Sequence, residues 1–472
     1  MLEPMSAPVP EESPKFASDW SIPDLDGRRM ALMDLAQQLF PIHRTLVNRG
    51  FDQSLEILQQ HLPLTIDGYR SGTAVWDWVI PNAWDVNEAW IERLDGERLV
   101  DFRDSNIHLS AYSVPFDGVV THEDLLKHVA IHPDLPDAIP YNYLYYNRDW
   151  QFNVTHHQFA RFTDDHYRVR IDIDERPGEL KVGSYRLPGE TDDEFIISTY
   201  LCHPSMANDN LSGVLVATEL MRQLSRLPRR RQTWRLLILP ETIGVLTWLS
   251  HNEELLPRIR GAYTVYNCGD SGPITYKQSW FPGADVDVAA AHVLRHYPTL
   301  GGEARVIPWH PSGSDERQFN APGVRIAGGS FMRTPPGEFA EYHTSLDTLD
   351  ILDPDALLDS VQALFRICRV HDENRILAPT YRGEPCFSRH EIEYPSYYDD
   401  RGDESKMLVK KLIYELDGRR SLLEIADRWN EPLHRVVDIV RSFERAGLAR
   451  EVLGTESVVE PKPMRGHQGV SP

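Results

Sequence analysis

The sequence has few cysteines, no long apolar run and no excess of basic residues. Its four cysteines, Cys202, Cys268, Cys368 and Cys386, are widely spaced and form no CxxC pair. This spacing argues against a disulfide framework and fits a reducing compartment. No stretch approaches the roughly 18 apolar residues of a membrane span, and the acidic, proline-rich start does not resemble a signal peptide. We therefore expect a cytoplasmic protein with no membrane partner.

The charge balance excludes further classes of partner. The chain has 71 Asp and Glu against 49 Lys and Arg, a formal net charge of −22. Nucleic acids and anionic membranes are bound through basic surfaces, so we expect neither as a ligand. With 41% apolar and 25% charged residues, the composition is that of an ordinary globular protein. A length of 472 residues suggests about three domains.

The composition and the hydrophobic periodicity of the sequence change along the chain. Residues 1–25 are rich in Pro, Ser and Glu and predict a flexible tail. Residues 26–67 carry apolar residues at helical spacing, whereas residues 68–189 are rich in aromatic residues and follow a short, strand-like period. We interpret 68–189 as an inserted β-rich domain. Its aromatic residues are more typical of a core than of a binding cleft.

An alternation of strands and helices occupies residues 190–380. "EFIISTYL" at 194–201 is a continuous apolar run, typical of a strand buried on both faces. A helical pattern follows at 210–227, then strand patterns at 234–240 and 261–268 with further helices between and after them. This order predicts an α/β domain, shared with residues 26–67, in which a largely parallel sheet carries helices on both faces.

The last part of the chain differs again. Residues 381–402 predict an irregular linker, residues 403–454 three short helices in a winged-helix-like domain, and residues 455–472 a tail. Residues 404–451 contain ten Lys and Arg against nine Asp and Glu, and a DNA-reading winged helix is usually more basic. We expect an interaction or dimerisation module, with a peptide or carrier partner as the alternative. We also expect the chain to form a homo-oligomer.

Polar residues follow three of the predicted strands. His203 and Asp209 follow the first strand, Glu241 the second and Asp270 the third. The carboxyl ends of parallel strands meet at one edge of a sheet, where α/β proteins build their sites. Later loops add Asp315, in "GSDERQF", and a sequence "EYHTSLDTLD" with its own histidine and aspartate.

Histidines and carboxylates of this kind suit a hydrolytic zinc site. Zinc takes nitrogen and carboxylate ligands and keeps one position open for water. A further carboxylate that does not bind the metal then moves the proton. Taken singly, each residue has a plainer interpretation: Asp209 as a helix N-cap, Glu241 as an acid near a helix N-terminus, and His203 as an ordinary buried or surface histidine. Their shared position at strand ends favours the metal site.

Five motifs together resemble a known family. "CHPSMANDNLSG", "PETIG", "NCGD", "PSGSDERQF" and "EYHTSLDTL" occur in this order. They are similar to a bacterial aminopeptidase-like family of the DUF4910/DUF2172 type, whose members are described as polysaccharide biosynthesis proteins with an aminopeptidase-like domain. This family resembles the M28-type zinc aminopeptidases. The resemblance covers most of residues 30–453 and implies a mixed sheet with helices on both faces, an inserted β domain and a C-terminal winged-helix domain.

The resemblance also implies roles for individual residues. It makes His203, Asp209, Asp270 and His343 metal ligands, and Glu241 the catalytic general base. Asp209 would bridge two metals, and Asp347 would be a supporting carboxylate.

The sequence departs from the zinc-aminopeptidase pattern at one position. That pattern has a second glutamate, a metal ligand, where this chain has Thr242. The cofactor we expect is therefore one zinc ion, with two as the alternative. His203 and Asp209 would hold a single zinc with either Asp270 or His343, and Asp315 could substitute as a ligand.

Three residues are candidates for substrate binding. Arg333 follows a predicted strand, and Arg317 and Asp315 lie in the loop near the expected site. Arginine binds carboxylates through two parallel hydrogen bonds, although either arginine could instead neutralise neighbouring acids in so acidic a chain.

We predict a zinc-dependent hydrolase that cleaves a small peptide or peptide-like amide, most simply an aminopeptidase. One alternative is a binding protein that keeps the fold but has a degenerate site, which Thr242 favours. The other is an amide hydrolase dedicated to natural-product or polysaccharide biosynthesis.

Overall fold

The computed structural model describes residues 20–390, 392 and 404–452. Most of the predicted N-terminal tail, half of the linker and the whole C-terminal tail lie outside the described residues. Trp20 and Ile22, which the sequence places in the tail, are both buried. The chain divides into two compact units, one spanning Ser18–Arg369 and the other containing the residues from Val370 onward.

An eight-stranded mixed sheet forms the centre of the first unit. Its four middle strands, β12 (Thr233–Leu239), β11 (Glu194–Tyr200), β13 (Ile259–Val265) and β16 (Gly328–Met332), are parallel. On one side β10 (Glu179–Leu187) and β1 (Thr65–Arg70) continue the sheet through antiparallel pairings. On the other side β14 (Thr275–Lys277) pairs antiparallel with β16 and parallel with β15 (Arg305–Ile307). The mixed α/β sheet expected from the resemblance is confirmed.

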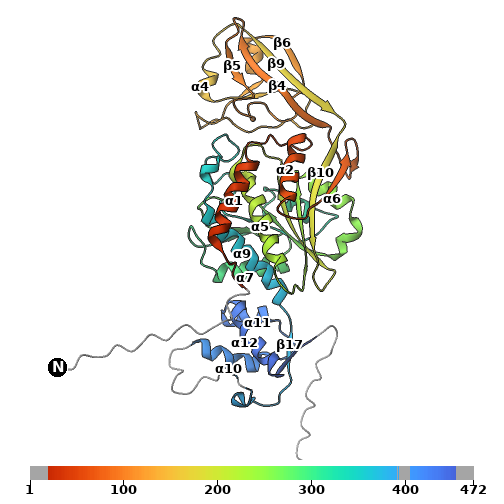
Figure 1. Cartoon of the computed structure of the whole chain (residues 1–472), viewed down its shortest axis with the longest axis vertical. Helices are drawn as coiled ribbons and strands as arrows, with labels where there is room; N and C mark the ends of the chain where they lie inside the picture. The colour runs from red at the N-terminus through yellow and green to blue at the C-terminus, as the bar shows by residue number, and fades with distance from the viewer. Residues whose placement is uncertain (1–19, 391, 393–403, 453–472) are drawn as a thin grey trace, which may run out of the picture. The chain divides into compact units, whose positions relative to one another are not determined.

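Helices bury this sheet. All seven residues of β11 are buried, so both faces of that strand are covered. Helix α5 packs on β11 and β13, and α7 on β13 and β16. The α-helices that accompany this sheet are α1 (Leu25–Leu39), α2 (Arg49–Gln59), α5 (Gly213–Ser225), α6 (Ile243–Ser250), α7 (Asp285–His296), α8 (Glu316–Asn320) and α9 (Pro354–Glu373) (Figure 1). The residues of α9 from Val370 onward are assigned to the second unit.

A second, four-stranded antiparallel sheet lies at one end of the first unit, beyond α1 and α2 (Figure 1). Its order is β5 (Arg98–Asp101), β4 (Ala83–Arg93), β9 (His166–Arg176) and β6 (Phe116–Thr121). Short elements accompany it: β2 (Ala74–Val75), β3 (Trp78–Val79), α3 (His122–Leu126), β7 (Val129–Ala130), β8 (Phe152–Asn153) and α4 (His156–Phe159). Trp84, Tyr167 and Phe152 are buried here, so these aromatic residues belong to a core.

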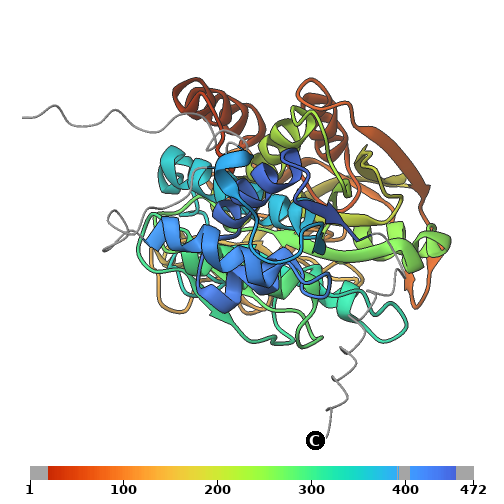
Figure 2. The ribbon, with the colours of Figure 1, turned by 90° about the horizontal axis from the view of Figure 1, so that it is seen from below.

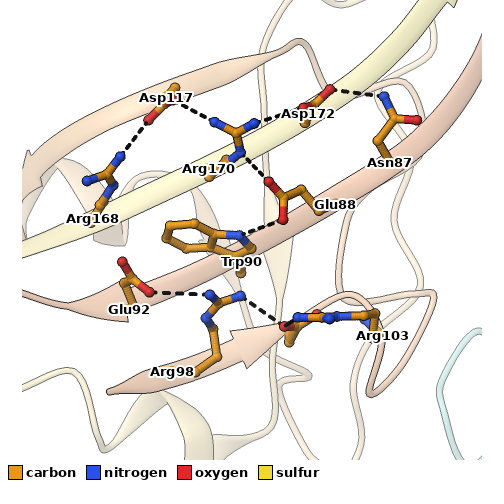
Figure 3. A network of polar contacts seen from close by, with 11 residues as sticks. Asn87, Glu88, Trp90, Glu92, Arg98, Arg103, Asp117, Arg168, Arg170 and Asp172 are labelled. Atoms are coloured by element: carbon orange, nitrogen blue, oxygen red, sulfur yellow. Dashed lines mark hydrogen bonds and ion pairs between the residues drawn. The ribbon is translucent and has the colours of Figure 1, made fainter. Parts of the chain in front are cut away.

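The outer face of this sheet carries a network of charges (Figure 3). Arg170 donates to Glu88 on one neighbouring strand, and to Asp117, on the other, at 2.9 Å. The guanidinium of Arg98 lies 4.0 Å from the centre of the Trp90 ring. A charged face opposite a buried one is the pattern of an antiparallel sheet with one side in water. These charged side chains form ion pairs with one another across neighbouring strands.

Strand β10 differs from the sequence-based expectation. It lies within residues 68–189, the range predicted for the insert, but pairs with β1 and β12 in the large sheet. Only the short turn after Arg176 separates it from β9. The two sheets are therefore joined by the consecutive strands β9 and β10. Both strands show the same strand-like periodicity, so the sequence does not indicate that the chain changes sheet between them.

The second unit contains α10 (Glu404–Glu415), α11 (Leu422–Trp429) and α12 (Leu433–Arg445), drawn in blue in Figures 1 and 2. Strands β17 (Leu377–Pro379) and β18 (Ala449–Glu451) pair antiparallel. The helices bury apolar residues such as Leu412, Ile425 and Val440. Three helices and a small sheet are compatible with a winged helix, which stays a prediction.

None of the helices in the described part of the chain has the length and apolar character needed to cross a bilayer. Cys202 and Cys268 are buried thiols, in keeping with a chain that does not depend on a disulfide framework.

Candidate metal centre

The carboxyl ends of the middle strands bring the predicted site residues together. β11 ends at Tyr200, three residues before His203, and β12 ends at Leu239, two residues before Glu241. Nε2 of His203 lies 3.9 Å from Oε2 of Glu241. The backbone carbonyl of His203 accepts a hydrogen bond of 2.8 Å from the buried Arg44, which fixes the segment after β11.

The turn at Ala207–Ser212 aims Asp209 at the same edge. The backbone N–H groups of Asn208 and Asp209 donate to the two carboxylate oxygens of Asp347, at 2.7 and 2.8 Å. Asp347 thus holds the backbone of the turn that carries Asp209. Helix α5 then starts at Gly213, where a Cβ atom would lie 2.4 Å from the carbonyl oxygen of Val265. The glycine of "DNLSG" therefore allows the helix to begin against β13.

His203, Asp209 and His343 form a compact cluster. One ligand atom from each lies within 4.8 Å of the others. Nε2 of His343 lies 2.9 Å from Oδ2 of Asp209, and the Tyr200 hydroxyl donates to Oδ1 of Asp209. The side chains of His203 and Asp209 are almost fully buried, while that of His343 is 28% exposed. The cluster therefore reaches solvent through His343.

The electrostatics of the cluster suit a cation. Burial lowers the pKa of His203 to about 4, so its imidazole is neutral and has a lone pair to donate. Burial alone would raise the pKa of Asp209, but His203 and His343 together with the Tyr200 hydroxyl lower it to about 2. Two imidazoles and an ionised carboxylate are a donor set that zinc accepts. The residues present therefore fit a zinc ion.

Glu241 stands at the mouth of the cluster. Its side chain is 26% exposed, and its Oε1 accepts a hydrogen bond of 2.7 Å from the Ser314 hydroxyl. Burial raises the pKa of Glu241 to about 7, although the Ser314 hydrogen bond acts in the opposite direction. A carboxylate with such a pKa can both accept and release a proton near neutral pH.

Thr242 occupies a strained position beside Glu241. Its φ of 62° is rare for a β-branched residue. Its backbone N–H donates to Oδ1 of Asp315 at 2.6 Å, so the buried Asp315 holds the turn that presents Glu241. Asp315 is outside the cluster of three.

Asp270 is also outside the cluster. Its Oδ1 accepts hydrogen bonds from the Thr334 hydroxyl at 2.5 Å and from the N–H of Gly272 at 2.8 Å. Its Oδ2 accepts from the Asn208 side chain at 2.9 Å. Asp270 thus holds the Asn208 turn, whereas His343 joins His203 and Asp209 in the cluster.

The two candidate arginines have different surroundings. Arg333 is fully buried, and its guanidinium donates to Asp359 at 2.9 Å and to several backbone carbonyls. This arrangement gives it a structural role, away from the opening. Arg317 is half-buried, and its Nε donates to the Ser314 carbonyl at 3.0 Å.

Aromatic residues that the sequence did not mark as site residues enclose the cluster. The Tyr141 ring centre lies 5.1 Å from that of His203 and 5.4 Å from that of His343, and Tyr342 stacks on His343 at 4.1 Å. The N–H of Tyr141 donates to the carbonyl of His343 at 2.8 Å. Tyr141 belongs to the aromatic run "YNYLYY", which only the fold brings to the site, whereas Tyr342 directly precedes His343 in the sequence.

The α/β domain has an aminopeptidase-like fold. A zinc aminopeptidase from Bacillus subtilis superposes with a TM-score of 0.55 at 13% identity, over 74% of this chain and 94% of that one. At this identity the likeness concerns the fold alone.

The chain belongs to the family described as a domain of unknown function, DUF4910, which matches residues 33–374. A protein from Clostridium acetobutylicum is 36% identical over 430 residues, which cover 89% of this chain and 96% of the relative. It is provisionally named a polysaccharide biosynthesis protein with an aminopeptidase-like domain. A crystal structure of a provisionally assigned peptidase from the same organism has a TM-score of 0.83 at 34% identity, covering 91% of this chain and 98% of that one.

Proposed function

We propose that this protein is a zinc-dependent hydrolase that cleaves a peptide or peptide-like amide, most simply an aminopeptidase. The observation that carries this proposal is the position of Glu241, whose carboxylate lies 3.9 Å from His203 at the exposed side of the three-residue cluster. A carboxylate in this position has access to whatever the cluster binds. The fold shared with a zinc aminopeptidase supports the same reaction class.

His203, Asp209 and His343 would hold the metal. When bound there, zinc supplies a Lewis acid that polarises a carbonyl and lowers the pKa of water. Glu241 accepts a proton from the attacking water and delivers it to the leaving amide nitrogen. Ser314 holds one oxygen of Glu241 at 2.7 Å, which leaves the other oxygen to move the proton.

The same residues support one metal rather than two. Thr242 offers a hydroxyl where the zinc-aminopeptidase pattern has a carboxylate, and the Asp270 oxygens are occupied by Thr334, Gly272 and Asn208. A second zinc would lack both ligands. The name of the Clostridium relative favours a biosynthetic context as the second candidate, in which the same chemistry acts on an intermediate of a polysaccharide pathway.

Metal removal tests the proposal directly. Purified protein should release the amino-terminal residue from short peptides, lose this activity on chelation and regain it with zinc. Peptide hydrolysis followed by chromatography measures all three states. Hydrolysis that survives complete chelation contradicts a metal-dependent reaction, whereas a zinc-loaded protein that cleaves neither peptides nor simple amides favours the binding-protein alternative.

The activity should depend on pH through Glu241. A general base works only when deprotonated, so kcat/KM should fall about tenfold per pH unit below the pKa of this group and level off above it. Burial raises that pKa to about 7, and a bound cation lowers it. We expect the acidic limb at or below about pH 7. Because the Ser314 hydrogen bond favours the charged form, Ser314→Ala should move the limb to higher pH. A limb that does not move would remove Glu241 from this role.

A further inference from the structure

Arg317 lies beside the proposed general base. It follows the first residue of α8, and its Nε donates to the carbonyl of Ser314 at 3.0 Å. The hydroxyl of the same serine donates to Glu241 at 2.7 Å. Ser314 therefore connects the guanidinium to the carboxylate that would move the proton, and both side chains are partly exposed.

Arg317 makes no direct ion pair in the part of the chain that the structure describes. Within residues 20–390, 392 and 404–452, no carboxylate lies within ion-pair distance of its guanidinium, although the chain has a net charge of −22. By contrast, Lys277 and Arg333 each pair with a buried acid, Glu316 and Asp359 respectively. Arg317 keeps its two terminal nitrogens available, the pair of donors that matches a carboxylate.

Two tyrosines lie beside the cluster. Tyr143 is 49% exposed, and its ring centre lies 6.0 Å from that of Tyr141, which in turn neighbours His203. Tyr342 stacks on His343 at 4.1 Å. Both rings therefore offer aromatic surface next to the site.

We propose that Arg317 binds a carboxylate of the substrate and so restricts the enzyme to short peptides whose free carboxylate lies close to the scissile amide. This inference rests on the proposed function, because Glu241 marks where the amide lies. Only Ser314 separates Arg317 from Glu241, so a carboxylate one residue beyond the amide suits the geometry. Dipeptides and dipeptide-like amides are then the substrate class, with Tyr143 and Tyr342 packing on their side chains.

Binding measured without turnover tests this assignment. Leu-Gly and its carboxamide, Leu-Gly-NH₂, differ only in the carboxylate, and the Glu241→Gln protein binds without cleaving. Calorimetry on zinc-loaded Glu241→Gln should show at least about tenfold tighter binding of Leu-Gly. Adding Arg317→Gln should abolish the difference, and Arg317→Lys should keep part of it, since lysine retains the charge but not the fork. The control is Arg305→Gln, whose arginine pairs with Glu338 at 2.7 Å and should leave the preference intact.

The outcomes separate the two proposals. Equal binding of the acid and the amide, no detectable binding of either, or a preference that survives Arg317→Gln overturns the assignment of Arg317. Peptide hydrolysis by the native protein is a separate readout. A carboxylate preference that depends on Arg317, in a native protein that hydrolyses nothing, upholds the carboxylate site and defeats the hydrolase.

Discussion

Replacing Glu241 with Gln should lower kcat by about a thousandfold while leaving zinc bound. General acid–base groups contribute roughly 10² to 10⁴ to a rate, and Glu241 is proposed to act twice, on water and on the leaving nitrogen. Glutamine matches the shape of glutamate and can still accept the Ser314 hydrogen bond, so the fold around this position should not change. The loss should therefore lie in kcat, with little change in KM.

Steady-state kinetics and metal analysis on the same preparation measure this effect. Glu338→Gln is the matched control, because Glu338 is a surface carboxylate paired with Arg305 and should leave kcat unchanged. A Glu241→Gln protein that hydrolyses peptides as fast as the native one would exclude Glu241 as the base. A protein that loses zinc together with activity would instead make Glu241 a ligand.

Replacing Asp209 with Asn should abolish zinc binding and, with it, activity. Asp209 is fully buried, and its carboxylate lies 2.9 Å from Nε2 of His343 and accepts from Tyr200. Asparagine keeps the shape but not the negative charge that balances a dication. Loss of an outer partner of a metal ligand commonly costs roughly 10- to 100-fold in metal affinity, and loss of a ligand should cost more.

Thermal unfolding with and without zinc provides the readout. Zinc should raise the Tm of the native protein, because a ligand that binds only the folded state stabilises it, and should not raise the Tm of Asp209→Asn. Asp285→Asn, a change at an exposed residue of α7, is the control and should keep the native response. An equal rise for Asp209→Asn and the native protein would place the metal elsewhere.

The alternation of strands and helices between residues 190 and 380 could be predicted because each element has a clear period. β11 is rich in apolar residues and is buried along its whole length. His203 and Glu241 could be placed at the same edge because parallel strands end together. For these two residues, the position predicted from the strand pattern agrees with the position in the structure.

Other features depend on contacts that sequence spacing does not encode. Asp270 follows a strand as Glu241 does, yet its oxygens are taken by Asn208, Thr334 and Gly272. Tyr141 reaches the cluster only because its segment pairs with residues near His343. These positions depend on contacts between residues far apart in the sequence. The periodicity of one segment does not indicate which distant segment it will contact.

Zinc content per chain is the most decisive measurement for the proposed metal centre. The protein would be purified without added metal or a histidine tag and submitted to elemental analysis beside Asp209→Asn. We predict about one zinc ion per native chain, from a single set of three ligands with an open position, and none in the variant. A native protein that contains no metal, and retains none after zinc is added and washed out, would rule out a zinc centre at this site.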